Sequence, residues 1–346
     1  MQIVGSIRAG IALCNSLYEN IFPSNLEVEI KLINRLLEAC NTFRVNQHKN
    51  LSEIDVKLYH YTNILALKDI LQNRKIWLTK ADYMNDSQEV VYATEKISRI
   101  FMETFDYRSK CYNQVMNKII IPNRFNKRAF IVSLSRDHDS LPLWSNYAHM
   151  EGYNLAFRSD RLYHATQESV ENMIKSKSSE TCKVVCGKDY NIIIDDIIYN
   201  KEIQDDIVME IINKMELVMS FYRKSDISAH QTNKLLESLA KRLQIYIVLF
   251  KQQSFKAEKE SRMIITIEDT NVLDNMIRHR ISNGAFVPYI EIDLKLKIDS
   301  SPFKGITIGP RNNSDLAAKG MKSFLLKNDY IVNDNDIIKS CIPLRY

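Results

Sequence analysis

A histidine at the end of a strand-like segment is the first residue of the sequence that could do chemistry. His60 lies in the run from Leu58 to Thr62, which the amphipathic segment 63–74 follows directly. A strand that ends in polar residues and turns into a helix presents them at a sheet edge, where ligands commonly bind. His60 is therefore a candidate site residue, although a histidine between two tyrosines is also a common hydrogen-bonded core residue.

Charged side chains alternate along a second segment. Glu258, Glu260 and Arg262 point the same way if this segment is extended, because successive strand side chains face opposite sides. Such a row is either a functional cluster or an ion pair on a solvated strand edge. Ser133 and Ser135, also two residues apart, share a face of another strand-like run.

A polar triplet after that run suggests metal chemistry. Asp137, His138 and Asp139 lie in a predicted loop, and carboxylates with histidine can hold divalent ions for phosphodiester hydrolysis. Consecutive residues do not converge on one ion, however, and such triplets are more often solvated turns. Further candidate ligands of this metal-dependent nuclease hypothesis are Asp86, Glu89 and Glu260.

Two predicted helix starts compete with these chemical roles. Asp86 is a good N-cap for a helix over 87–105, and Glu89 three residues later completes a capping box. A proline opens a short helix that carries Trp144 and Tyr147 three residues apart, which places both rings on one face.

The order of the elements predicts an α+β fold with a mixed or antiparallel sheet and surrounding helices. Helical periodicity predicts a helical cap over residues 1–50, outside a single α+β domain over 51–346. Two amphipathic segments predict a helical hairpin inserted at about 200–250. The predicted strands cover 57–62, 76–80, 129–135, 153–158, 261–267, 286–293 and 304–308, and the remaining helices cover 63–73 and 314–327.

Composition limits the class of protein. The chain has 346 residues, of which 45% are hydrophobic and 26% charged, as in soluble globular proteins. No apolar run reaches the length of a membrane helix and no signal peptide is recognisable, so a cytoplasmic location is expected. Cys182 and Cys186 lack a second pair, so no metal is expected. The net charge of +5 suits a nucleotide partner, while the absence of Gly-rich phosphate-binding motifs argues against Rossmann and P-loop folds.

Seven short motifs in order resemble the bacterial domain of unknown function 2971 family over roughly residues 56–346. This family name implies no reaction. The motifs lie at 58–62, 76–89, 130–135, 143–148, 255–262, 309–311 and 340–345.

The layout also resembles, more distantly, the ADP-ribosyltransferase superfamily, whose split antiparallel sheet cradles NAD. The resemblance implies that His60 bonds a ribose hydroxyl and that Tyr147 or Trp144 stacks on nicotinamide. It implies that Glu260 stabilises the cation that forms on the ribose as nicotinamide leaves. Residues implied to flank NAD are Tyr61, Thr62, Ser133, Ser135, Glu258, Arg262 and Arg311.

The implied function is that of an NAD-consuming ADP-ribosyltransferase or NAD hydrolase, a bacterial toxin or anti-phage defence effector. NAD is then a substrate, and the acceptor is a protein, a nucleic acid or water. A third hypothesis is a module that binds a nucleotide or nucleic acid without catalysis, in which His60, Trp144, Tyr147 and Arg262 line the pocket.

The transferase hypothesis makes two spatial predictions. His60, Ser135, Tyr147 and Glu260 should surround one cavity, and the hypothesis fails if His60 and Glu260 lie on opposite sheet faces. At least one of Arg262 and Arg311 should reach the cavity or fix Glu258 or Glu260.

Overall fold

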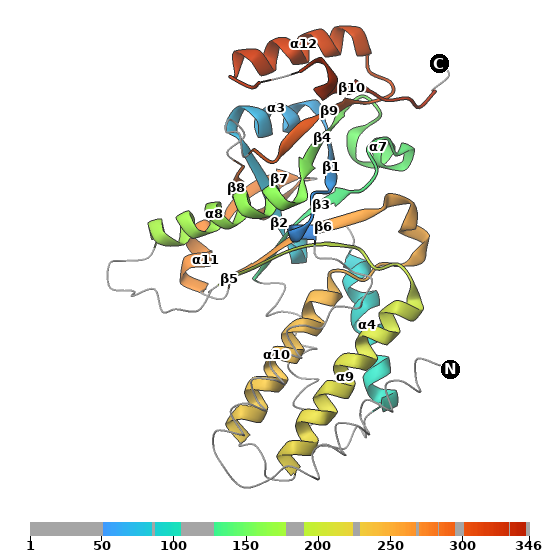
Figure 1. Cartoon of the computed structure of the whole chain (residues 1–346), viewed down its shortest axis with the longest axis vertical. Helices are drawn as coiled ribbons and strands as arrows, with labels where there is room; N and C mark the ends of the chain where they lie inside the picture. Colours follow the sequence, from blue (N-terminus) through green and yellow to red (C-terminus); the bar gives the residue numbers. More distant parts are fainter. Residues whose placement is uncertain are drawn as a thin grey trace. The chain divides into compact units, whose positions relative to one another are not determined.

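The computed structural model divides the chain into two compact units, Met1–Phe43 with Lys214–Ser238 and Arg44–Asn213 with Leu239–Tyr346. The second unit carries the sheet and all the residues discussed below (Figure 1). The predicted helical cap over 1–50, Asp86, Cys182 and Cys186 lie outside the described residues. The structure describes residues 51–84, 87–104, 128–177, 190–223, 229–267, 270–282, 284–294, 301–331 and 333–343.

A mixed sheet of ten strands forms the centre of the described part, which confirms the α+β prediction. Eight strands follow the order β10-β9-β4-β1-β3-β2-β8-β7, while β6 pairs with β3 and β5 with β6. All these pairs are antiparallel except β9 with β10. The strands are β1 Lys57–Thr62, β2 Lys75–Lys80, β3 Ala129–Ser135, β4 Tyr153–Arg158, β5 Tyr190–Asp196, β6 Glu260–Ile267, β7 Arg278–Ser282, β8 Ala285–Asp293, β9 Phe303–Ile308 and β10 Ile337–Lys339.

The helices include the two long ones expected near 200–250. The elements that were not predicted are α8, α11, β5, β7 and β10, and of these β7 borders the site. The helices are α3 Ile64–Asn73, α4 Ser87–Thr104, α7 Leu141–Ala148, α8 Ser159–Lys177, α9 Lys201–Arg223, α10 Ala229–Ile247, α11 Thr270–Met276 and α12 Ser314–Lys327.

The sheet is split along one edge of β3. On its other edge β3 pairs with β6 from Ala129 to Ser135. On the split edge β1 pairs at Tyr59↔Ser135, and β2 pairs at Thr79↔Ile131 and Lys80↔Phe130. Because β1 and β2 diverge between these points, the middle of β3 lies open between them.

Alternating residues of β3 supply core to both faces of the sheet. Phe130, Val132 and Leu134 are buried in a core that also contains residues of α3, α8 and α12. Ala129 and Ile131 belong to a second core on the other face. The strand is therefore fixed from both sides, and its open edge is a rigid base for a site.

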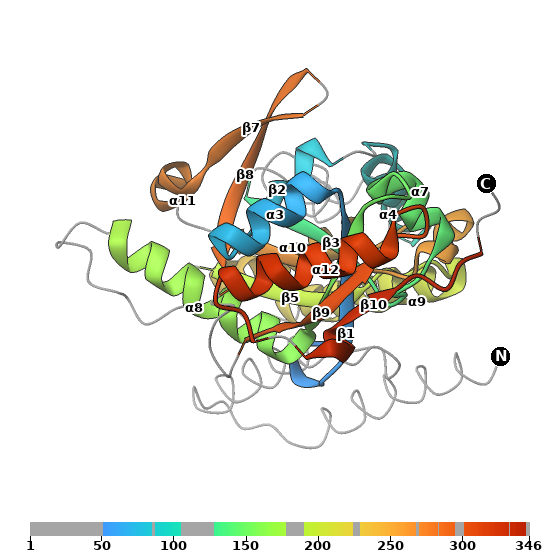
Figure 2. The same cartoon turned by 90° about the horizontal axis from the view of Figure 1, so that it is seen from above.

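A hairpin of β7 and β8 extends the sheet at one end. Figure 2 shows its tip reaching beyond the other strands. The inner half of β8 pairs with β2 from Tyr289 to Asp293, while β7 pairs with β8 along its whole length. Polar residues of β7 are thereby placed beside β2 and the split.

Candidate functional site

A cavity of about 900 Å³ opens at the split in the sheet. Its walls include residues 59–62 of β1 and 131–135 of β3, with further side chains from α3, β2, β6 and the β7–β8 hairpin. This volume is within the usual range for small-molecule sites. Nine of the eleven candidate site residues line it: His60, Tyr61, Thr62, Ser133, Ser135, Tyr147, Glu258, Glu260 and Arg262.

Glu260 and His60 reach this cavity from opposite faces of the sheet. Tyr59 pairs with Ser135 and Ser135 pairs with Glu260, so these three side chains share a face. His60, the next residue along β1, alternates to the other face. All four residues of the first spatial prediction line one cavity, but His60 and Glu260 lie on opposite faces of the sheet, the arrangement that was expected to exclude the transferase hypothesis. They can nevertheless contact one ligand because the split joins the two faces.

The imidazole of His60 is held by the open edge of β3. Its Nδ1 lies 3.1 Å from the carbonyl oxygen of Ser133. A neutral ring that donates from Nδ1 presents Nε2 as an acceptor. Burial lowers the pKa of His60, the Ser133 carbonyl opposes this shift, and the charge of Arg280 adds to it.

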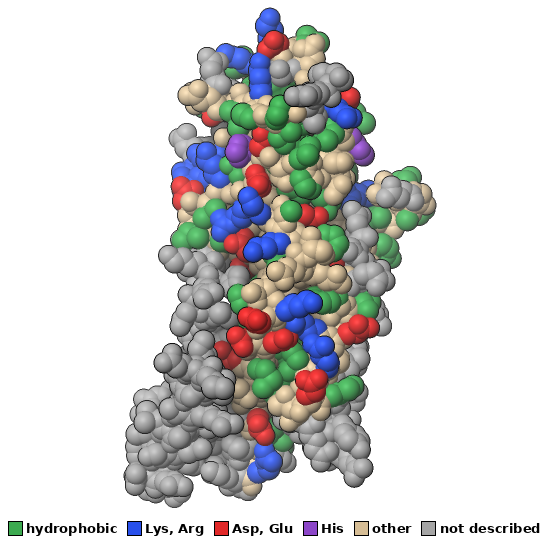
Figure 3. Space-filling view, turned by 90° about the vertical axis from the view of Figure 1, so that its right-hand side faces the viewer, with side chains coloured by type: hydrophobic (Ala, Val, Ile, Leu, Met, Phe, Trp, Pro, Cys, Tyr) green, Lys and Arg blue, Asp and Glu red, His purple; other side chains and the backbone are tan. Residues whose placement is uncertain are grey.

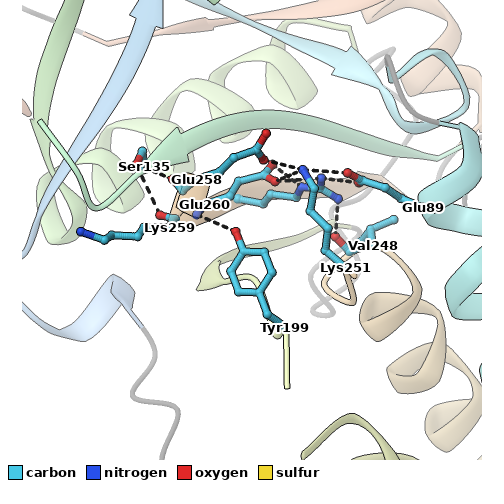
Figure 4. Close-up of polar contacts among 9 residues, drawn as sticks. Glu89, Ser135, Tyr199, Val248, Lys251, Glu258, Lys259 and Glu260 are labelled. Carbon is cyan, nitrogen blue, oxygen red and sulfur yellow. Dashed lines mark hydrogen bonds and ion pairs between the residues drawn. The ribbon is translucent and has the colours of Figure 1, made fainter. Parts of the chain in front are cut away.

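Five charged side chains form a network at the β6 side of the cavity, here called the charged cluster: Glu89, Lys251, Glu258, Glu260 and Arg262 (Figure 4). The Nζ of Lys251 lies 2.7 Å from Glu258, 3.0 Å from Glu260 and 2.8 Å from Glu89. Arg262 donates to Glu260 at 2.7 Å and to Glu89 at 2.6 Å. Three carboxylates against two cations leave one net negative formal charge.

The backbone around Glu258 and Glu260 is fixed by hydrogen bonds. The Oγ of Ser135 donates to the carbonyl oxygen of Glu258 at 2.8 Å. The amide of Glu260 donates to the Tyr199 hydroxyl at 2.9 Å, as Figure 4 shows. Lys259 between them has a positive φ of 44°. This turn lets two glutamates that are not both in β6 point into the same cluster.

The charged cluster keeps Glu260 ionised although its residue is only 6% exposed. Burial raises the pKa of this carboxyl, but Arg262, Lys251 and a hydrogen bond from Ser133 outweigh burial, so the pKa is lowered. Tyr147 faces the same charges from α7. Burial and the charge of Glu258 raise the pKa of Tyr147 to about 12, so its hydroxyl stays protonated at neutral pH.

Trp144 and Arg311 do not line the cavity, and their predicted roles there are wrong. Trp144 is fully buried, packs edge-on against Tyr61 at 4.7 Å between ring centroids, and donates from Nε1 to Asp139 at 2.8 Å. Helical residues three apart are still about 60° apart around the axis, so α7 buries one ring and leaves Tyr147 42% exposed. Arg311 is exposed after β9, where its amide donates to Met150.

Arg262 fulfils the prediction made for the pair of arginines, since it binds Glu260. Glu89 differs from its predicted capping-box role, because its carboxylate bonds Arg262 and Lys251.

The candidate metal ligands are engaged elsewhere. Asp137 pairs with Lys259 at 2.9 Å, and Asp139 accepts hydrogen bonds from Trp144, Ser340 and the amide of Cys341. Within the described ranges no three His, Cys, Asp or Glu side chains are arranged to hold a metal ion. The side-chain geometry therefore gives no support to the nuclease hypothesis.

Among the residues of the cavity wall that sequence reasoning missed are Lys251, Trp77 and Arg280. A buried lysine leaves no signal in a single sequence, because its burial depends on distant carboxylates. Arg278 and Arg280, in contrast, did leave a signal in the sequence. They are two residues apart, just before an Asn-Gly pair that is typical of a tight hairpin.

Two further observations concern the surface charge and the hydropathy of the helices. On the face in Figure 3, the basic and acidic side chains of the described residues are interspersed and form no continuous basic stripe. None of the helices in the described ranges is long and apolar enough to cross a membrane.

The segment from α7 to β6 contains Tyr147 and the residues of the charged cluster except Glu89. Residues 143–263 match the family model DUF2971, described as a protein of unknown function. Similarity to DUF2971 thus includes four cavity-lining charges, whereas His60, Ser133 and Ser135 precede the matched segment. No curated protein and no solved structure matches the chain.

Proposed function

We propose that the cavity binds NAD and that the protein cleaves the bond between nicotinamide and ribose. One observation carries this proposal: Glu258 and Glu260 are fixed carboxylates on the wall of a nucleotide-sized cavity, beside Ser133 and the hydroxyl of Tyr147. A reaction that builds positive charge on a sugar carbon is accelerated by negative charge held in advance at that place.

The reaction needs no external oxidant or reductant. The C–N bond between ribose and nicotinamide breaks, and its electron pair passes to the nicotinamide nitrogen. Water or a nucleophilic group of an acceptor then forms the new bond to the ribose carbon and releases a proton. The net negative charge of the charged cluster stabilises the cation between these events.

The remaining cavity residues suit a ribose and a nicotinamide ring. His60 donates from Nδ1 to Ser133, so its Nε2 can accept a hydrogen bond from a ribose hydroxyl. Tyr147 is exposed beside the charged cluster and offers an aromatic ring to nicotinamide. His60 would contact the ribose from across the split.

The test is the release of nicotinamide from NAD by purified protein, with and without nucleic acid or cell extract. We expect Glu260→Gln to lower the rate about a hundredfold or more, because it removes one preorganised charge. NAD affinity should survive. Glu151→Gln, a matched change at an exposed position, should leave the rate unchanged. Wild-type rates in both Glu258→Gln and Glu260→Gln would refute the carboxylate mechanism.

A second candidate function is nucleotide binding without turnover. Both oxygens of Glu260 accept hydrogen bonds from cations, Oε1 from Arg262 at 2.7 Å and Oε2 from Lys251 at 3.0 Å. This pairing reduces the negative charge that the carboxylate presents to a substrate. A rise in melting temperature with NAD, without release of nicotinamide under any acceptor condition, would identify this function.

A further inference from the structure

An arginine without an acidic partner lines the cavity at the β7–β8 hairpin. Arg280 donates from one guanidinium nitrogen to Oγ1 of Thr79 at 2.8 Å. Its Nε is buried and has no hydrogen-bond partner. In the part of the chain that the structure describes, no carboxylate pairs with it, and burial lowers its pKa.

The neighbouring charges do not neutralise Arg280. Glu291, the acidic residue of this wall, binds Lys75 at 2.9 Å and lies 3.5 Å from Arg278. The three cations Lys75, Arg278 and Arg280 outnumber the carboxylates outside the charged cluster, which are Glu291 and, on α3, Asp69. Arg280 is half-buried with its Nε fully buried, and partial burial of a cation without a counter-ion favours the binding of an anion there.

The guanidinium is also oriented by an aromatic ring. Its central carbon lies 6.0 Å from the ring centroid of Trp77, which packs against Tyr289 at 4.5 Å. Trp77 and Thr79 are two residues apart on β2 and share the face of the sheet on which Arg280 lies. The arginine is therefore held by Thr79 and Trp77 of β2 on the wall of the cavity.

We propose that Arg280, with Thr79 and Trp77, forms a subsite that binds a phosphate group of the ligand. The identification of that phosphate as the pyrophosphate of NAD rests on the proposed function. A planar guanidinium with unused N–H donors matches two phosphate oxygens, a contact that lysine cannot reproduce.

The two ends of the cavity then bind different parts of one nucleotide. Thr79 lies two strands from β6 and about four residues along it from Glu260, a separation of roughly 15 Å by strand geometry. This is a separation between backbones, and the pyrophosphate of a dinucleotide lies only one ribose away from the reacting carbon, so the side chains of Glu260 and Arg280 must cover the rest of the distance. The nicotinamide riboside of the dinucleotide, which is cationic, would lie at the charged cluster, and its pyrophosphate would lie at Arg280.

Calorimetric titration of three probes tests the subsite: ADP-ribose, inorganic pyrophosphate and nicotinamide riboside, which has no phosphate. Arg280→Gln should weaken binding of the first two by about tenfold to a hundredfold, the usual effect of losing a charged hydrogen-bond donor. The binding of nicotinamide riboside should be unaffected by this substitution. The affinity of Arg280→Lys for ADP-ribose and pyrophosphate should lie between those of wild type and Arg280→Gln, because lysine keeps the charge but lacks the planar guanidinium with several donors.

Arg158→Gln is the matched control, since Arg158 pairs with Asp55 and Asp160 and does not line the cavity. It should change affinity for pyrophosphate less than threefold. Arg280→Gln should melt no lower than wild type, because it removes an unpaired charge. If the melting temperature of Arg280→Gln falls, the probe affinities of Arg280→Lys are compared with those of wild type instead, and this comparison decides whether the subsite exists.

The outcomes separate the subsite from the proposed function. Equal binding of ADP-ribose by wild type, Arg280→Gln and Arg280→Lys would overturn the subsite while leaving NAD cleavage intact. Arg280-dependent binding of pyrophosphate by a protein that does not bind NAD would support the subsite and refute the proposed function. Equal losses for nicotinamide riboside and ADP-ribose would show that Arg280 is structural, and would also overturn the subsite.

Discussion

Each charged side chain of the charged cluster depends on an opposite charge in a nearly dry environment. Lys251 contacts Glu89, Glu258 and Glu260, and its side chain is 5% exposed. These contacts raise its pKa far above the usual value against the opposing effect of burial. The cluster therefore holds the two candidate catalytic carboxylates in place and keeps them ionised.

Removing Lys251 should destabilise the protein strongly. Lys251→Gln leaves three buried carboxylates with one cation, and breaking a buried ion pair in this way costs about 3 to 5 kcal/mol. The measurement is the free energy of unfolding from urea denaturation, followed by tryptophan fluorescence.

Lys259→Gln is the control, because Lys259 also pairs with a carboxylate, Asp137, but its side chain is 60% exposed. Exposed ion pairs contribute about 0 to 1 kcal/mol, so Lys259→Gln should lower the free energy of unfolding only slightly. Similar effects of the two substitutions would mean that the charged cluster is open to water and not fixed.

At the scale of elements, α7 must pack closely on β1 to place Tyr147 beside the charged cluster. Gly152 lies where the chain leaves α7 and enters β4. A Cβ there would be 2.3 Å from the carbonyl oxygen of Thr62 and 2.7 Å from that of Ala148. Glycine thus permits the contact of helix and strand that forms one rim of the cavity.

Gly152→Ala should destabilise the protein and displace this rim. Forcing backbone apart in a packed region costs about 1 to 3 kcal/mol, and the same change should weaken nucleotide binding because Thr62 and Tyr147 move. Gly320→Ala is the matched control. Gly320 lies within α12 with no atom within 4 Å of the added Cβ, so alanine should stabilise by about 0.5 to 1 kcal/mol. If both substitutions stabilise the protein, the close contact does not exist in solution.

Sequence patterns predicted the elements that have strong apolar periodicity. β3 and β6 were found because their buried residues form nearly continuous runs. β7 was missed because its side chains are exposed or half-buried at the end of the sheet, where no apolar pattern is required. The site followed the same rule. Glu260 and Ser135 could be placed by alternation along strands, whereas Lys251 and Arg280 acquire their environment only through distant partners.

At the scale of the molecule, the split in the sheet determines what the site can do. It joins side chains from both faces, so His60 and Glu260 can contact one ligand although strand alternation separates them. It also places a net negative end, at the charged cluster, and a net positive end, at Arg280, in a single cavity. A ligand with a cationic ring and a pyrophosphate complements this arrangement.

The most direct test is a crystal structure of the protein with a non-hydrolysable NAD analogue. We expect the analogue in the cavity at the split, with its nicotinamide riboside beside Glu258 and Glu260 and its pyrophosphate within hydrogen-bonding distance of Arg280. An analogue bound outside this cavity, or bound with its phosphates at the charged cluster, would contradict the proposed function.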